Sequence, residues 1–136
     1  MRRLVRALAY LWASPNTLLG LTLGAVLGGR TSEWHVVDGV VEISGPRLAN
    51  WLDRPWGAMS SIMAITFGHV VLAQSRVAHD FTRTHERVHV RQYERWGPAF
   101  LPAYLGASGY LWLRGRDCYR GNPFEKEAYG DEGGGV

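Results

Sequence analysis

The sequence is poor in cysteine and in clustered charge, and each shortage excludes a class of protein. Cys118 is the one cysteine in 136 residues, which excludes an internal disulfide and a metal site built from paired cysteines. The formal net charge of +3 is mild, and the arginines are spread along the chain instead of forming a block with aromatic residues. Nucleic acid is therefore not indicated as a partner. Any metal ion must be held by histidine and carboxylate side chains.

The hydrophobic content of 46% suits one domain with a single core. We divide the chain into an apolar N-terminal segment (residues 1–30), a domain (31–130) and a flexible tail (131–136). In the first of these, Ser14-Pro15-Asn16-Thr17 interrupts the apolar run, and the part from Leu18 to Leu27 is shorter than the roughly 20 residues of a spanning helix. We expect a hairpin that is buried or lies on a membrane surface, with a signal peptide or an anchor as the alternative. A cytoplasmic and a membrane-associated location both stay open.

Short strands are predicted in the first half of the domain. Asp38-Gly39 separates two β-branched runs and predicts a hairpin over residues 33 to 44. Arg47 to Trp56 is expected to form a short helix or a loop. The apolar run from Ala64 to Ala73 predicts one further strand, with Gly68 as a bulge or a close backbone approach. We expect these strands to form a small antiparallel sheet in an α+β fold.

Helices are predicted in the second half. Asp80 as N-cap and Gly97-Pro98 as a stop signal predict a helix from Phe81 to Trp96. One face of it is apolar and should point to the core, and it carries Phe81, His85, Val88, His89, Gln92 and Trp96. The opposite face is expected to be solvated or to contact acidic lipids, and it carries Arg83, Arg87, Arg91 and Arg95. The apolar stretch from Phe100 to Arg114 predicts a kinked core helix or a membrane-embedded one. Asn122-Pro123 should begin a last helix.

The motif His85-Glu86-Arg87-Val88-His89 lies on the first of these helices. One helical turn places His85 and His89 side by side, so their imidazoles can hold one Zn²⁺ ion. Glu86 lies about 100° around the helix, where its carboxylate can take a proton from a zinc-bound water. A pair of hydrogen-bonded core histidines is the alternative. A zinc site needs a third protein ligand, and Glu125 or Glu127 can supply it, although Glu125 also fits a capping box begun by Asn122.

With these residues, HERVHVRQ and NPFEKEAY, the chain resembles the gluzincin (HExxH…E) zinc metallopeptidases and a set of small bacterial zincin-like proteins. The resemblance implies a minimal zincin-like domain in which the sheet packs on the HExxH helix. It also implies His85, His89 and Glu125 as zinc ligands and Glu86 as the catalytic base. A peptide substrate would pair with the strand that borders the cleft. Tyr129 stands where the family usually has an aspartate, which removes a carboxylate that would orient a ligand.

The combined prediction is a zinc-dependent metallohydrolase, with a peptide or protein as its substrate. The oxyanion would be stabilised by Tyr104, Tyr119 or Arg120, among which the sequence does not choose. His69 and His79 are expected to be structural. One alternative function is a non-catalytic zinc protein. The other is a membrane-surface interaction module that uses residues 1–30 for peripheral contact.

Overall fold

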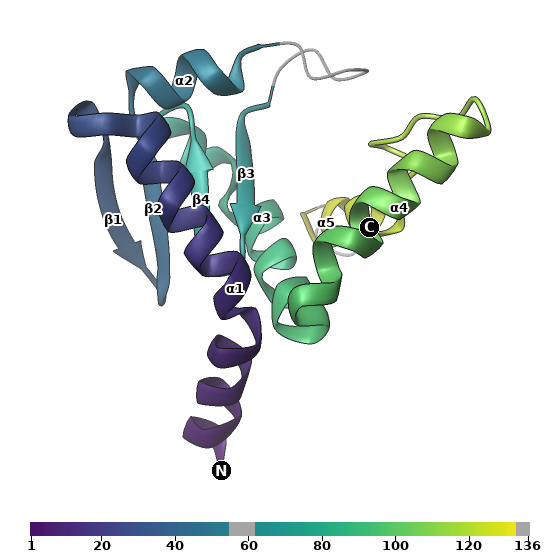
Figure 1. The fold of residues 1–136 in the computed structure, drawn as a ribbon, viewed down its shortest axis with the longest axis horizontal. Helices are drawn as coiled ribbons and strands as arrows, with labels where there is room; N and C mark the ends of the chain where they lie inside the picture. The colour runs from purple at the N-terminus through teal and green to yellow at the C-terminus, as the bar shows by residue number, and fades with distance from the viewer. Residues whose placement is uncertain (55–61, 133–136) are drawn as a thin grey trace.

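The structure, a computed structural model, describes residues 1–54 and 62–132 (Figure 1). Its helices and strands run in the order α1 (Arg2–Gly28), β1 (Glu33–Val37), β2 (Val40–Ser44), α2 (Pro46–Leu52), β3 (Ala64–Phe67), β4 (Val70–Ala73), α3 (Arg76–Trp96), α4 (Phe100–Leu113) and α5 (Pro123–Glu132). The 3-10 turns η1 (Gly29–Thr31) and η2 (Gly97–Ala99) follow α1 and α3. The predicted α+β class is confirmed. Trp56 and the end of the predicted tail, residues 133–136, lie outside the described residues.

The sheet is mixed, so the prediction of an antiparallel sheet is wrong. Its strand order is β1-β2-β4-β3. Each outer pair is an antiparallel hairpin, whereas β2 and β4 pair in parallel at the centre. The parallel pair arises because β2 and β4 are each the second strand of a hairpin, and α2 lies in the connection that brings the second hairpin beside the first.

Glycine turns set both hairpins. Asp38 and Gly39 have φ values of 51° and 78°, as the predicted Asp-Gly turn requires. The predicted single strand from Ala64 to Ala73 is wrong, because Gly68 has a φ of 62° and turns the chain back on itself. A side chain at Gly68 would collide with Thr17 of α1, so the close backbone approach expected there is present.

Helices α1 and α3 cover opposite faces of the sheet. Val70 and Leu72 pack with the hydrophobic residues of α1, whereas Val71, which points to the other face, packs with Val90 of α3. Every residue of β4 is buried as a result. This two-sided burial explains why the sequence of β4 shows no alternation of apolar and polar residues.

Helix α1 is continuous from Arg2 to Gly28, so the predicted hairpin in this segment is wrong. Pro15 lies inside the helix and has no N–H to donate to the carbonyl of Leu11. The hydroxyl of Ser14 donates to that carbonyl instead, at 2.7 Å. Gly20 brings the helix close to the sheet, because an added Cβ would lie 2.8 Å from the Cβ of Val70. Among the described residues, no helix is long and apolar enough to cross a membrane.

Helix α1 is also hydrogen-bonded to the end of α3. The buried side chain of Asn16 donates to the carbonyl of Gly97 at 3.0 Å. The indole N–H of Trp12 donates to the carbonyl of Arg95 at 3.3 Å. These carbonyls belong to the C-terminal end of α3, where no further helical turn supplies donors. The N-terminal segment therefore supplies hydrogen-bond donors to carbonyls at the C-terminal end of α3.

The N-cap of α3 is Ser75 and not the predicted Asp80, and the Ser75 hydroxyl accepts a hydrogen bond from the N–H of Ala78. The arginine face is only partly solvated, which corrects the prediction. Arg83 donates to both carboxylate oxygens of the buried Glu42 on β2, at 3.0 and 2.7 Å, and Arg87 donates to it at 2.9 Å. Arginines that the helical period assigns to solvent thus join α3 to the sheet.

Several apolar residues expected in the core are exposed. Phe81 and Trp96, at the ends of the predicted apolar face, are 74% and 43% exposed. Helix α4 has Phe100 as its one buried residue, so the prediction of a core helix is wrong. In Figure 1, α4 and α5 stand beside the sandwich of α1, sheet and α3. The middle of α3 faces α5, and this contact forms the candidate site.

Candidate metal centre

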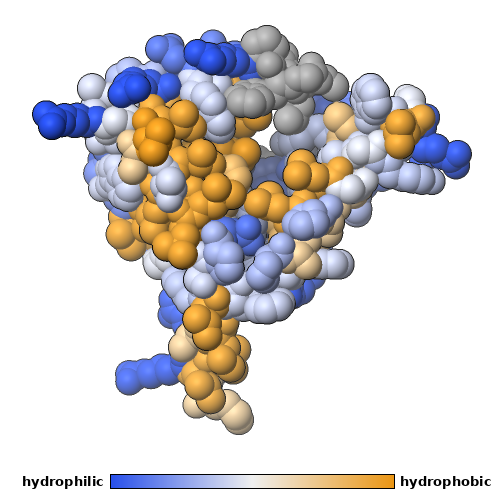
Figure 2. All heavy atoms as spheres, viewed as in Figure 1, coloured by the Kyte–Doolittle hydropathy of each residue, from blue (hydrophilic) through white to orange (hydrophobic). Residues whose placement is uncertain are grey.

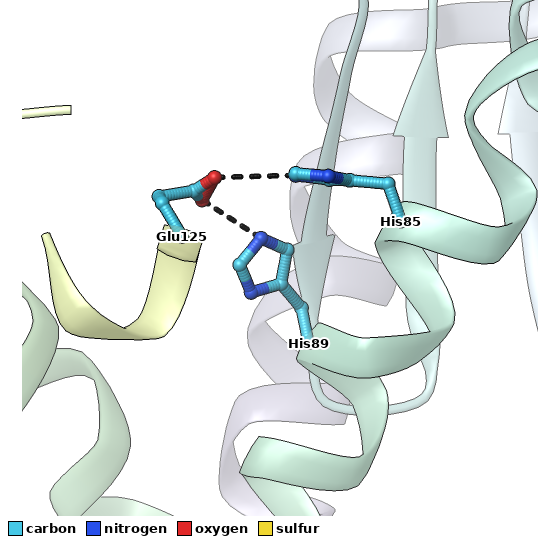
Figure 3. Close-up of side chains that lie close together, drawn as sticks. All are labelled: His85, His89 and Glu125. Atoms are coloured by element: carbon cyan, nitrogen blue, oxygen red, sulfur yellow. Dashed lines mark hydrogen bonds and ion pairs between the residues drawn. The ribbon is translucent and has the colours of Figure 1, made fainter. Parts of the chain in front are cut away.

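Two histidines of α3 and one glutamate of α5 meet in a buried cluster. The Nε2 atom of His85 lies 3.1 Å from Oε2 of Glu125, and Nε2 of His89 lies 2.7 Å from Oε1 of the same carboxylate. Figure 3 shows both imidazoles pointing from α3 towards the first turn of α5. Each residue is at most 6% exposed. One ligand atom from each lies within 4.8 Å of the others, so the three residues predicted from the sequence come together.

The position of Glu125 is set by the start of α5. Asn122 is fully buried and accepts a hydrogen bond from the N–H of Phe124, as predicted for the N-cap. Its amide also donates to the carbonyl of Tyr104 and to the hydroxyl of Ser108, both on α4. The Glu125 carboxylate points to the histidines, so the capping-box interpretation of Glu125 is not what the structure shows. Asn122 thus fixes where the carboxylate enters the site.

Glu127 is not part of the cluster. Its carboxylate accepts hydrogen bonds from Gln92 at 3.2 Å and from Arg95 at 2.9 Å, and its side chain is 46% exposed. Two residues along a helix is about 200° of rotation, so the side chains of Glu125 and Glu127 leave α5 in different directions and cannot both reach the two histidines. The structure therefore places Glu125, of the two candidates, beside the histidines.

Polar neighbours orient the cluster. Gln92 Oε1 lies 2.8 Å from Nδ1 of His89, which acts as the donor and leaves Nε2 to face Glu125. The Tyr104 hydroxyl donates to Oε1 of Glu125 at 3.1 Å. Gln92 shares the predicted face with His89, but no sequence signal gave its role; Tyr104 appeared only as one of several oxyanion candidates. Such partners fix the direction of metal-ligating side chains.

Of the other predicted residues, Tyr119 and Tyr129 lie beside the cluster. Tyr129 stacks edgewise on His85, with ring centroids 4.5 Å apart, and its hydroxyl lies 3.0 Å from that of Tyr119. Arg120 belongs to an exposed turn in which Asp117 accepts from its backbone N–H. Tyr129, which stands where the resembled family usually has an aspartate, thus contacts His85 through its ring.

Glu86 is buried beside the cluster and faces the sheet. It is 5% exposed, and the hydroxyl of Thr66 on β3 donates to its Oε2 at 2.5 Å. Burial raises the pKa of Glu86 above its ordinary value, and the neighbouring charge of His89 opposes the rise. Tyr93 of α3 donates to the carbonyl of the same threonine at 2.8 Å. Thr66 thus holds both the carboxyl and the strand against α3, a role that sequence reasoning missed.

The charges of the cluster are strongly coupled. Burial alone would lower the pKa of His89, but the hydrogen bond and charge of Glu125, with the charge of Glu86, raise it to about 9. Burial alone would raise the pKa of Glu125, but the hydrogen bonds to His85 and His89 lower it to about 2. Two imidazole nitrogens and a carboxylate oxygen are also donors that Zn²⁺ accepts, so the residues present fit a zinc ion.

The remaining buried histidines have structural partners, as predicted. His79 Nε2 donates to the carbonyl of Ile43 at 3.0 Å. His69 Nε2 lies 2.8 Å from Oε1 of Glu94, and its ring stacks on Tyr10 with centroids 3.7 Å apart. Neither belongs to the metal cluster among the described residues.

No protein-family model matches the sequence, and no curated protein or solved structure matches the chain. Assigning a function to the cluster of His85, His89 and Glu125 therefore depends on its own geometry and chemistry.

Proposed function

We propose that this chain is a zinc-dependent metallohydrolase of the zincin-like type, most simply a peptidase. His85, His89 and Glu125 would hold the ion. The observation that carries the proposal is the buried cluster of these three residues, with ligand atoms within 4.8 Å of one another. A buried carboxylate, Glu86, follows the first ligand directly in the helix. A pair of core histidines needs neither a shared carboxylate nor a second acid beside it.

The chain's own residues would divide the work of hydrolysis. A bound Zn²⁺ supplies Lewis-acid chemistry, since it lowers the pKa of a coordinated water to about 7 and polarises a carbonyl oxygen. Glu86 takes up the proton of the attacking water and returns it to the leaving amine. Thr66 holds one oxygen of Glu86 in place, and burial raises the pKa of that carboxyl above its ordinary value. Gln92 keeps the Nε2 atom of His89 available as a ligand.

The place of β3 in the sheet supports a peptide as substrate. Among the described residues β3 is an edge strand, because the sheet order ends with it. It carries Thr66, which contacts Glu86. An edge strand beside the reacting groups can pair with an extended peptide through backbone hydrogen bonds. Of the two strands found where one was predicted to border the cleft, we propose β3 as the strand that pairs with the peptide.

The decisive experiment measures metal content and hydrolysis in matched variants. Protein purified without chelator is analysed by elemental mass spectrometry, for the wild type, Glu125→Ala and Glu127→Ala. We expect about one zinc per chain in the wild type and Glu127→Ala, and loss of zinc in Glu125→Ala. Glu86→Gln should retain zinc and lose hydrolysis of a peptide library by about a hundredfold or more. A wild type that neither contains zinc nor takes it up on titration would overturn the proposal.

A non-catalytic zinc site is the second candidate. It is favoured because Glu125 on α5 pairs with His85 and His89 on α3. An ion bound by these three residues would hold α5 against α3. In that case zinc removal would loosen α5, and the zinc-loaded wild type would hydrolyse no member of the library. Equal hydrolysis by the wild type and Glu86→Gln would instead show that the activity comes from elsewhere.

A further inference from the structure

The face of α1 that points away from the sheet is apolar and exposed. Its residues are between 41% and 69% exposed, and they are Leu11, Trp12, Leu18, Leu19 and Val26. No charged residue occurs between Arg6 and Arg30. A helix on the surface of a globular protein usually carries charged residues opposite its buried side. The fully buried residues of α1 are small, and its exposed side carries large apolar side chains where charged residues are usual.

Helix α4 has the same property. Large side chains along it are 59% to 76% exposed, namely Leu105, Tyr110, Trp112 and Leu113. No charged residue occurs between Arg95 and Arg114. Figure 2 shows apolar side chains gathered over α1 and over α4 on one face of the molecule. We call the exposed side chains of these two helices the α1–α4 face. Exposed apolar side chains that gather on one face mark an interaction surface.

The two segments that carry the α1–α4 face have positive charges alone. Residues 1–32 and 95–116 contain no aspartate or glutamate. Six of the seven arginines in these segments stand near the ends of the two helices and are exposed: Arg2, Arg3, Arg6, Arg30, Arg114 and Arg116. The seventh, Arg95, pairs with Glu127. Arginine side chains at the ends of an apolar surface reach lipid phosphates while their stems stay in apolar surroundings. Tryptophan and tyrosine, as at Trp12 and Tyr110, favour the same boundary between water and hydrocarbon.

We propose that the α1–α4 face binds the surface of an anionic lipid bilayer. The apolar side chains enter the boundary between headgroups and acyl chains, and the flanking arginines contact lipid phosphates. A second copy of the chain fits this face less well, because a two-fold contact would bring the arginines of both copies together without acidic partners. The inference is independent of the metal site and goes beyond the proposed hydrolysis.

The test is co-sedimentation of the full chain with vesicles of phosphatidylcholine alone or with about a third phosphatidylglycerol. The test variant combines Leu18→Asp with Trp112→Asp, on α1 and α4. The control combines Val36→Asp with Phe81→Asp, which are 73% and 74% exposed on β1 and α3. All four positions are exposed, so both variants should fold, as circular dichroism and thermal unfolding would verify. We expect the test variant to bind anionic vesicles about tenfold or more weakly, with the control unchanged.

Removing positive charge gives a second readout. Arg2→Gln combined with Arg3→Gln should weaken binding to anionic vesicles about tenfold while binding to neutral vesicles changes little. Glu125→Ala should bind vesicles like the wild type, which separates this inference from the metal site. Two results would overturn it: no binding of the wild type to either vesicle, or equal loss in test and control variants. A dimer in light scattering that Leu18→Asp with Trp112→Asp dissociates, without vesicle binding, would assign the face to a second copy.

Discussion

The buried carboxylate of Glu42 joins α3 to the sheet, and its removal should cost measurable stability. Glu42→Gln keeps the shape of the side chain but removes the charge that accepts from Arg83 and Arg87 at 2.7 to 3.0 Å. Loss of one partner of a buried ion pair costs about 3–5 kcal/mol. Arg83 is 31% exposed and regains water, so we expect about 2–3 kcal/mol here, or a fall in Tm of about 8 °C.

The pH dependence of this loss has a definite sign. Burial alone would raise the pKa of Glu42, but hydrogen bonds from Arg83, with the charge of His79, hold it below the ordinary value of 4.5. A carboxyl with a lowered pKa in the folded state stabilises the fold above its ordinary pKa and loses that effect as the pH falls through the lowered one. The gap between wild type and Glu42→Gln should therefore be full at neutral pH and close progressively below pH 4.5.

Urea unfolding followed by tryptophan fluorescence would measure both effects. Glu33→Gln on β1 is the matched control, because its side chain is 62% exposed and its nearest ionic partner, His35, lies at 3.5 Å. The control should stay within about 0.5 kcal/mol of the wild type at every pH. A Glu42→Gln variant that does the same would refute the role assigned to the ion pair. So would a destabilisation that stays constant as the pH falls.

Three further predictions test packing, capping and the metal cluster. Gly20→Ala should destabilise the protein by about 1–3 kcal/mol, because the added Cβ would lie 2.8 Å from the Cβ of Val70. Gly106→Ala has open space around it and should stabilise the protein by about 0.5–1 kcal/mol. Thermal unfolding measures both, and a change of stability in the same direction for both variants would contradict the packing of α1. Asn122→Ala removes the buried N-cap of α5 and should lower the free energy of unfolding by about 2–4 kcal/mol in a urea titration. A change under about 0.5 kcal/mol would contradict this capping role. Tyr104→Phe removes a hydrogen bond to Glu125 and should weaken zinc binding about tenfold in competition with a chelating dye, and unchanged affinity would deny it an orienting role.

Local signals predicted the parts of the fold that are decided locally. Asp38-Gly39 requires a tight turn, and the structure has a hairpin there. His85 and His89 meet because one helical turn separates them, whatever the rest of the chain does. Asn122-Pro123 fixes the start of α5, and this start sets the direction in which Glu125 points. Spacing therefore paired the two histidines and left Glu125 and Glu127 as candidates for the third ligand, whereas the choice of Glu125 came from the resemblance to the gluzincins.

The misassigned elements depend on contacts between distant parts of the chain. The run around Gly68 looked like one strand because β4 is buried on both faces and has no alternation to reveal its ends. The predicted break in α1 is an exception with a local cause, because the hydroxyl of Ser14 donates to the carbonyl of Leu11 that Pro15 leaves without a donor. The helical period shows which face of α3 is charged but not where the sheet lies relative to that face. The sequence therefore did not predict the pairing of Arg83 with Glu42.

The hydrogen bonds from α1 to the carbonyls at the end of α3 tie the helix of the proposed lipid-binding face to the helix that carries His85 and His89. A rotation of α1 against the sheet would break them and leave the buried amide of Asn16 without its partner, which opposes movement of α1 relative to α3. The histidines on α3 consequently have a fixed height above any plane on which the outer face of α1 rests. Under the proposed lipid binding and the proposed hydrolysis together, the protein would select substrates by the distance of the scissile bond from the lipid surface.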